Sequence, residues 1–147
     1  VESYMKWKKG VDPKKRRTDE DRIFKFICLA PRGMAVSPDM LFSDEFCPVY
    51  PDQKSIVFKV FATPRPNQRF CDEPYLLTSV NIGMKEIGKL TIELPDVHFK
   101  LDRSVEFGLK FGELLITATA RNKKTDNVYS TTFQYAKSES HFEPAVN

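Results

Sequence analysis

The chain of 147 residues lacks several features that would define a function class at once. No apolar run approaches the roughly 18 residues that a membrane-spanning helix needs, and the first ten residues lack the apolar stretch of a signal peptide. The six glycines are spread singly, and neither GxGxxG nor GxxxxGKS occurs. The sequence therefore predicts no transmembrane segment and no phosphate-binding loop.

Cysteine is scarce. The three cysteines, Cys28, Cys47 and Cys71, are odd in number and form neither short paired spacings nor a CxxC pair. This pattern argues against a disulfide framework and against a zinc site. We expect reduced, partly buried thiols in a cytoplasmic or nuclear protein.

Groups that could carry catalysis are also few. His98 lies in the turn-like segment DVHFKLDR and His141 lies near the C-terminus, and nothing local orients a Cys–His pair around either one. Adjacent carboxylates such as Asp44 and Glu45 face opposite sides of a strand, so they form no two-carboxylate site. The sequence predicts no enzyme activity, no metal and no cofactor for this fragment.

Positive charge is concentrated at the start of the chain. Residues 1–17 contain seven Lys or Arg and two acidic residues, a net charge of 7 − 2 = +5, whereas the whole chain carries +3, which leaves −2 for residues 18–147. We interpret residues 1–20 as a basic leader or linker, residues 21–136 as the domain and residues 137–147 as a mobile tail. Two interpretations of the leader stay open: a solvated linker, or a weak anion contact through residues 1–17 with a nucleic acid or an anionic membrane.

Alternation of apolar and polar residues with a period of two is the dominant pattern, and it is typical of half-buried β-strands. It occurs in RIFKFICL (22–29), SIVFKVFA (55–62), KLTIEL (89–94), SVEFGLK (104–110), LLITATA (114–120) and VYSTTFQY (128–135). The polar segment NKKTDN (122–127) predicts the turn of a hairpin between the last two. DMLFSDEF (39–46) fits one helical turn or an irregular strand, and YLLTSV (75–80) fits a short edge strand.

Short strands about ten residues apart, separated by proline-rich connections, favour an antiparallel sandwich or a partly open barrel. We predict an all-β fold, an antiparallel β-sandwich of about eight strands without a helical lid. The long connection from Pro64 to Met84 is of the kind that is functional or partly structured.

The order of these segments resembles the substrate-binding β-domain of the seventy-kilodalton heat-shock chaperones. FGELLITATARNKKTDN (111–127) is similar to a late hairpin of that family, and IGKLTIEL (87–94) is similar to its L-G-x-F-x-L strand. The resemblance covers residues 20–136 and is greatest to the divergent, lidless twelfth subfamily. The F-V-x-x-G-x-x-V and Y-x-P elements of that subfamily correspond here to Phe26, Ile27, Gly33 and Val36, and to Phe46, Cys47 and Pro48.

The resemblance implies a module that holds unfolded or extended polypeptides in a channel between loops, with a role in protein folding and stress response. It also implies an upstream nucleotide-binding domain in a longer parent protein, with ATP as the cofactor of that domain. The peptide-binding residues would be Phe46, Val49, Tyr50, Gln53, Ile56 and Phe58. Residues 18–21 would form the opposite side of an arch; because RRTDED is charged there, we expect an open or electrostatically tuned groove.

Other interpretations stay open. The apolar loop residues Phe46, Val49 and Tyr50 also fit a role as caps of the core, and Ile56 and Phe58 also fit core positions of a strand. A β-sandwich dedicated to one folded partner, without chaperone action, is an alternative function, and an anion-binding module is a third. If the chain binds peptides, the lack of a lid predicts micromolar or weaker affinity with fast exchange.

Overall fold

The computed structural model describes residues 1–64, 67–72 and 84–134. This part of the chain contains eight β-strands: β1 (Glu2–Lys6), β2 (Arg22–Phe26), β3 (Phe42–Phe46), β4 (Ser55–Ala62), β5 (Lys85–Glu93), β6 (Val105–Phe111), β7 (Leu115–Asn122) and β8 (Val128–Gln134). Its helical segments are two short 3₁₀ turns, η1 (Lys14–Arg16) and η2 (Val97–Phe99). Over these ranges, no helix has the length and apolar character needed to cross a bilayer.

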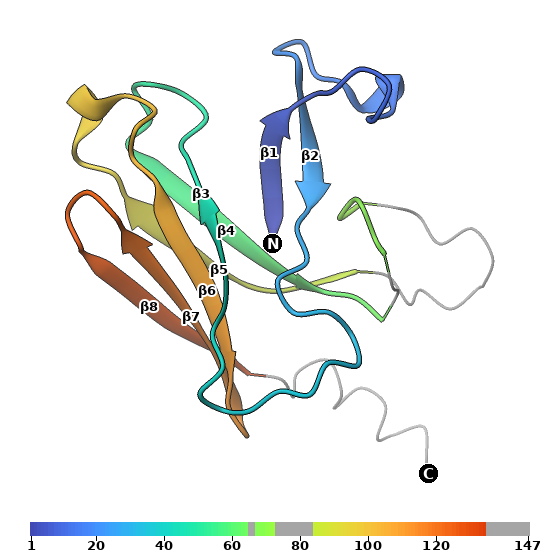
Figure 1. Cartoon of the computed structure of the whole chain (residues 1–147), viewed down its shortest axis with the longest axis vertical. Helices are drawn as coiled ribbons and strands as arrows, with labels where there is room; N and C mark the ends of the chain where they lie inside the picture. The colour runs from blue at the N-terminus through green and yellow to red at the C-terminus, as the bar shows by residue number, and fades with distance from the viewer. Residues whose placement is uncertain (65–66, 73–83, 135–147) are drawn as a thin grey trace.

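The strands form an antiparallel β-sandwich, which confirms the predicted fold class (Figure 1). One layer is a four-stranded sheet in the order β3-β6-β7-β8. The β4–β5 pair lies opposite this sheet, and the β1–β2 hairpin lies beside β4. β1 and β4 are in contact but share no hydrogen-bonded ladder in the described structure.

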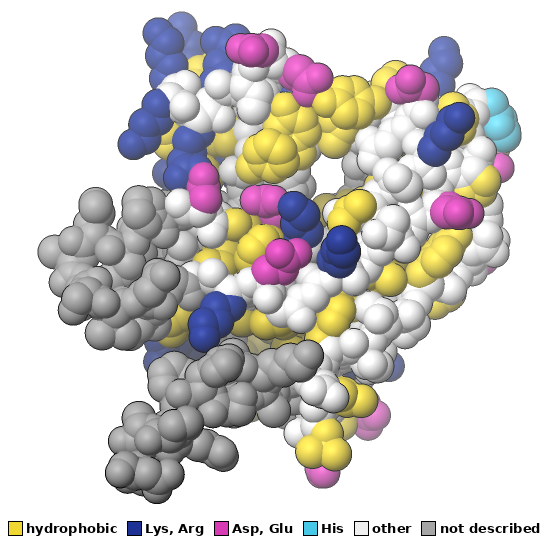
Figure 2. All heavy atoms as spheres, turned by 180° about the vertical axis from the view of Figure 1, so that it is seen from behind, with side chains coloured by type: hydrophobic (Ala, Val, Ile, Leu, Met, Phe, Trp, Pro, Cys, Tyr) yellow, Lys and Arg dark blue, Asp and Glu magenta, His cyan; other side chains and the backbone are white. Residues whose placement is uncertain are grey.

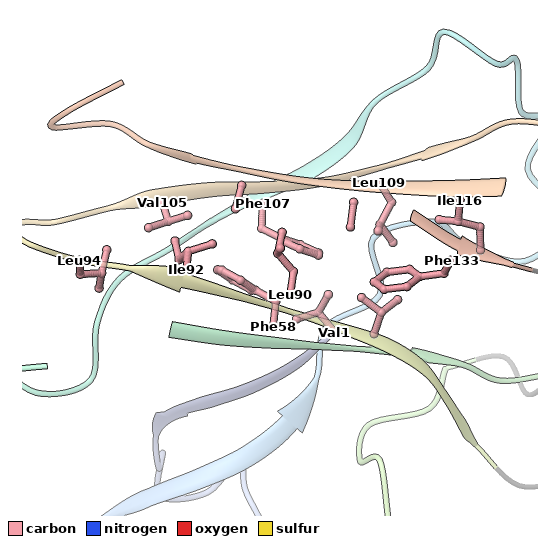
Figure 3. Close-up of a cluster of buried hydrophobic side chains, with 13 residues drawn as sticks. Val1, Phe58, Leu90, Ile92, Leu94, Val105, Phe107, Leu109, Ile116 and Phe133 are labelled. Atoms are coloured by element: carbon pink, nitrogen blue, oxygen red, sulfur yellow. The ribbon is translucent and has the colours of Figure 1, made fainter. Parts of the chain in front are cut away.

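The core lies between the two layers, and it follows the period-two pattern of the sequence. Figure 3 shows apolar side chains of β4 and β5 pointing toward those of β6, β7 and β8. The rings of Phe58 and Phe107 stack with centroids 4.4 Å apart, and Phe46 packs edge-on against both. Each fully buried phenylalanine of this kind contributes about 1.5–3 kcal/mol of transfer free energy.

The structure decides the ambiguous prediction for residues 39–46 and shortens the strand predicted for residues 22–29. Residues 39–46 contain β3, so the strand alternative is the correct one, and β3 pairs with β6. Within residues 22–29 only Arg22–Phe26 form a strand, and its core-facing residue is Ile23, which is fully buried, whereas Phe24 is exposed. The expected edge strand at residues 75–80 and the expected tail at residues 137–147 lie outside the described residues.

The segment interpreted as a leader contains a strand that the sequence analysis did not identify. β1 pairs along its whole length with β2, and residues 7–21, the β1–β2 loop, connect the two strands. The loop is folded back on itself: the indole N–H of Trp7 donates to the carbonyl of Pro13 at 3.2 Å, and the Trp7 amide donates to the carbonyl of Asp21 at 3.0 Å.

The two layers pack closely against each other at Gly88. A Cβ atom added to this residue of β5 would lie only 2.2 Å from two ring atoms of Phe133 on β8. The ring therefore packs directly on the backbone of β5, and any side chain larger than hydrogen at position 88 would force the two apart.

We predict that Gly88→Ala destabilises the protein by about 1–3 kcal/mol, although Ala normally stabilises a strand by about 0.5–1 kcal/mol relative to Gly. Urea unfolding measures the change. In a Phe133→Leu background the same substitution should cost less, because a smaller side chain leaves room for the added methyl group. An equal cost in both backgrounds would show that the Gly88–Phe133 contact is not the reason.

Candidate functional site

A trough runs between the β1–β2 hairpin and the rest of the sandwich. It consists of two adjoining cavities of about 220 and 280 Å³. One wall is formed by β1 with residues of β2, and the other by β4 and the end of β3 together with residues 47–54, the β3–β4 loop. Figure 2 shows a hollow in the upper part of one face, bordered by hydrophobic side chains. The two cavities share five lining residues: Ser3, Tyr4, Phe46, Cys47 and Val49.

Apolar and aromatic side chains dominate the inner cavity of the trough, the smaller one. Tyr4 of β1 and Phe24 of β2 stack with ring centroids 4.3 Å apart, and both line this cavity together with Val57 of β4. Phe24 is 50% exposed and Val57 is 46% exposed. Apolar surface gathered in a concave site and left open to solvent is typical of a binding site.

Among the described residues, no strand pairs with the edge of β1 that borders the trough. The amide of Ile27 donates to the carbonyl of Val1, so the odd-numbered residues of β1 exchange hydrogen bonds with β2. In an antiparallel ladder the peptide groups of the alternate residues point to the other edge. Three such residues of β1 line the trough: Glu2, Tyr4 and Lys6.

The facing edge of β4 likewise pairs with no strand in the part of the chain that the structure describes. The amide of Leu94 donates to the carbonyl of Lys54 at 2.8 Å, which places the even-numbered residues of β4 in the hydrogen-bonded pairs with β5. The peptide groups of Val57 and Lys59 therefore point away from β5, and both residues line the inner cavity. Two strand edges thus present main-chain donors and acceptors to one trough.

A hydrogen-bonded bridge joins the two loops beside the trough. The hydroxyl of Tyr50 in the β3–β4 loop donates to Glu20 Oε2 at 2.5 Å, and the hydroxyl of Tyr4 donates to the same oxygen at 2.9 Å. A guanidinium nitrogen of Arg22 also donates to the carbonyl of Val49 at 3.1 Å. The segment expected to be charged rather than apolar therefore supplies Glu20 as the central acceptor of a polar bridge.

The ionisation states that this bridge needs are the ones present at neutral pH. Hydrogen bonds from Tyr50 and then Tyr4 lower the pKa of Glu20, because they stabilise its charged form. The hydrogen bond to Glu20 in turn raises the pKa of Tyr50. The glutamate stays a carboxylate and the tyrosine stays a donor across the neutral range.

Arg103 holds the β3–β4 loop from inside the protein. Its side chain is fully buried. Its guanidinium donates to four main-chain carbonyls, at distances of 2.6 to 3.1 Å: those of Pro51, Gln53, Leu94 and Lys100. No carboxylate in the described part of the chain pairs with it, so carbonyl dipoles compensate the buried charge.

Gln53 gives the same loop its shape. Its side-chain oxygen accepts from the amides of Val49 and Tyr50, at 2.8 and 3.2 Å, and its side-chain nitrogen donates to the carbonyl of Ser55 at 2.7 Å. The polar atoms of Gln53 are therefore engaged within the protein. The residue positions the wall of the trough rather than offering its amide to a ligand.

The structure brings most of the predicted site residues together. Five of the six line the inner cavity: Phe46, Val49, Gln53, Ile56 and Phe58. The sixth, Tyr50, is exposed and forms the bridge. Phe58 is only 2% exposed and belongs to the core, so a substitution there would test folding rather than binding, whereas Ile56 is half-buried and both packs against the core and lines the cavity.

Sequence reasoning missed the residues of the opposite wall and the buried arginine. Tyr4 lay in a segment taken as a leader, and the outward-facing half of β4, which includes Val57, was not considered as a lining. Arg103 did carry a signal: it has the same parity as the buried Val105 and Phe107, so it stands at an inward-facing position. A charged residue at such a position indicates a buried cation with dedicated acceptors.

Other parts of the described structure offer fewer groups suited to binding or catalysis. A larger cavity of about 570 Å³ is lined by none of the six predicted site residues. The three cysteines are free, with Cys28 and Cys47 exposed; burial raises the pKa of the Cys71 thiol to about 12, so it stays protonated at neutral pH. Within the described ranges, no group of three or more His, Cys, Asp or Glu residues is placed to hold a metal ion.

Comparison of the chain with protein-family models, with curated proteins and with solved structures finds no match. The function proposed below therefore rests on the trough and on the sequence resemblance.

We predict that Arg103→Met lowers the free energy of unfolding by about 2–4 kcal/mol, because buried carbonyls lose their charged donor. Arg103→Lys should recover only part of the loss, since an ammonium cannot reproduce the planar fork. The control is Arg121→Met, which removes exposed ion pairs with Glu106 and Asp126 and should cost less than about 1 kcal/mol. Similar losses for both arginines in urea unfolding would contradict the anchoring role.

Proposed function

We propose that this chain is the peptide-binding β-domain of a chaperone-like protein and that it holds an extended segment of polypeptide in the trough. The observation that supports this most directly is the presence of two strand edges, on β1 and β4, that pair with no other strand among the described residues and that border one apolar cavity. Proteins often bind extended peptides by adding a strand to an exposed edge, where main-chain hydrogen bonds give affinity and side-chain pockets give specificity.

The trough supplies both elements of that binding mode. An extended guest would exchange hydrogen bonds with the peptide groups of the β4 edge, at Val57, and would lie against the side chain of Tyr4, because β1 and β4 contact each other and leave no room for a strand bonded to both. Side chains of an extended chain alternate in direction, so every second residue of the guest would enter the apolar cavity, against Val49 and Ile56. Because main-chain contacts are independent of sequence, such a site suits many unfolded polypeptides that share apolar residues.

In this proposal the Tyr50–Glu20 bridge closes the trough over the guest. The bridge is small and exposed, so it opens without much cost. Peptides should therefore exchange fast and bind with micromolar or weaker affinity, because closure mainly slows dissociation.

The sequence resemblance to the seventy-kilodalton heat-shock chaperones supports the same function and extends it to the parent protein. By that resemblance, an upstream nucleotide-binding domain would bind and hydrolyse ATP, while the present domain would bind polypeptide without catalysing a reaction. The proposed setting is protein folding under stress in the cytoplasm or nucleus. The alternative is an interaction sandwich dedicated to one folded partner, which would capture that partner while apolar peptides fail to bind.

We predict that Val57→Pro abolishes binding of an apolar heptapeptide, because proline removes the main-chain donor that faces the trough. The fold should survive, since the lost N–H makes no bond to β5. The matched control is Thr91→Pro, which removes the equivalent donor on the outer edge of β5. Fluorescence anisotropy measures affinity, and circular dichroism verifies folding. Equal affinities of the two folded variants would rule out main-chain binding at this edge.

We also predict that Tyr50→Phe and Glu20→Gln accelerate both association and dissociation of the peptide, because each weakens the bridge. Stopped-flow fluorescence measures the two rates.

Since the pKa of Glu20 is lowered in the folded protein, the bridge is fully present above the range in which a free glutamate titrates, about pH 4, and is lost as the pH falls below it. In wild type, dissociation should therefore accelerate at acidic pH, and in Tyr50→Phe this acceleration should be smaller. Tyr129→Phe is the control; rates that match wild type in all three variants would exclude a closing role.

A further inference from the structure

The β1–β2 loop carries a basic surface that is separate from the trough. Four exposed lysines flank Val11 in the sequence of the β1–β2 loop, and Val11 itself is 63% exposed. We call this surface the lysine tip: Lys8, Lys9, Lys14 and Lys15, with Val11. None of the four lysines has an ion-pair partner among the described residues. Figure 2 shows Lys and Arg side chains gathered at the upper left, over the β1–β2 end of the molecule.

Folding removes negative charge from this surface. Asp12 is the one carboxylate between Lys8 and Lys15, and its side chain is fully buried, where it pairs with Lys25. One of its oxygens also accepts from the amide of Lys8 at 2.8 Å. The carboxylate that would neutralise the lysines in a solvated linker therefore points into the protein, and the lysine tip is more basic than its sequence indicates.

The backbone fixes the shape of the tip. The amides of Val11 and Asp12 both donate to the carbonyl of Lys8, at 3.2 and 2.9 Å, and Gly10 provides the positive φ of 81° that the turn requires. Lys14 then begins the 3₁₀ turn η1. The lysines are thus presented by an ordered turn, so binding through them costs little backbone entropy.

We propose that the lysine tip binds the surface of an anionic lipid bilayer, with Val11 inserted among the headgroups. Lysines that flank an exposed apolar residue match the chemistry of such a surface, where each cation gains favourable energy from the negative potential and the apolar side chain gains from burial. The membrane would then hold the domain by the end of the β1–β2 hairpin and leave the trough open.

The other basic and aromatic residues of the segment favour a membrane over a nucleic acid. Single-stranded nucleic acids are bound by exposed rings on which bases stack, but the ring of Trp7 is covered by the guanidinium of Arg17 at 4.7 Å. Arg17 is further paired with Asp21, and Arg16 with Asp72, each at 2.6 Å. The groups best suited to bases and phosphates are therefore already occupied.

Vesicle co-sedimentation of the whole chain tests the proposal. We expect binding to vesicles of phosphatidylcholine mixed with an equal amount of phosphatidylserine, no binding to phosphatidylcholine alone, and weaker binding as salt is added. Replacing Lys9, Lys14 and Lys15 by Gln should lower the partition coefficient by roughly one hundredfold. The matched control replaces three exposed lysines elsewhere by Gln and should bind as wild type does: Lys54, Lys89 and Lys110.

Two further measurements test whether Val11 inserts into the bilayer and whether a soluble anion competes with it. Val11→Ser should weaken binding to the anionic vesicles while leaving its salt dependence unchanged, and inorganic phosphate should compete no better than chloride at equal ionic strength. Equal binding to neutral vesicles, no binding at all, or equal losses in the two triple variants would overturn the proposal. It would also be overturned if single-stranded DNA bound more tightly than the anionic vesicles and lost binding in the same triple variant.

Discussion

The trough depends on the hydrogen bonds that the buried guanidinium of Arg103 donates to main-chain carbonyls. Within residues 47–54, Gln53 bonds to the amides of Val49 and Tyr50 and so shapes the loop, but these bonds alone do not join the loop to the interior of the sandwich. By donating to carbonyls of this loop and of the segments before and after η2, Arg103 fastens them to one another inside the sandwich. A charge without a carboxylate partner is costly to bury, and here the cost is offset by four acceptors with well-defined directions.

The trough is bordered by strand edges of a kind that most β-proteins cover. An unpaired strand edge invites pairing with another chain, and natural sheets usually cover, shorten or charge such edges. In this chain the edges of β1 and β4 border one narrow trough, which suits a guest in an extended form. In the proposed function, this arrangement would restrict edge pairing to single segments of polypeptide, and the stacked rings of Tyr4 and Phe24 would favour apolar segments.

The core could be predicted from the sequence because burial in a sandwich follows a local period of two, as the buried Leu90 and Phe107 show. One loop of the site could be predicted through the resemblance to a known family. The opposite wall could not, because β1 is short and alternates weakly, and only its pairing with β2 brings Tyr4 to the trough. The bridge between Tyr50 and Glu20 joins residues 30 positions apart, and such a contact depends on how two loops meet rather than on either loop alone.

The polar nature of the bridge has a thermodynamic consequence. A contact between apolar side chains in the same place would expose hydrocarbon to water each time it opened, with a large change in heat capacity. A hydroxyl bound to a carboxylate exchanges one hydrogen-bond partner for water and uncovers little apolar area. In the proposed function, the balance between a closed and an open bridge would accordingly vary little with temperature, and the residence time of a bound peptide would respond to salt and protons instead.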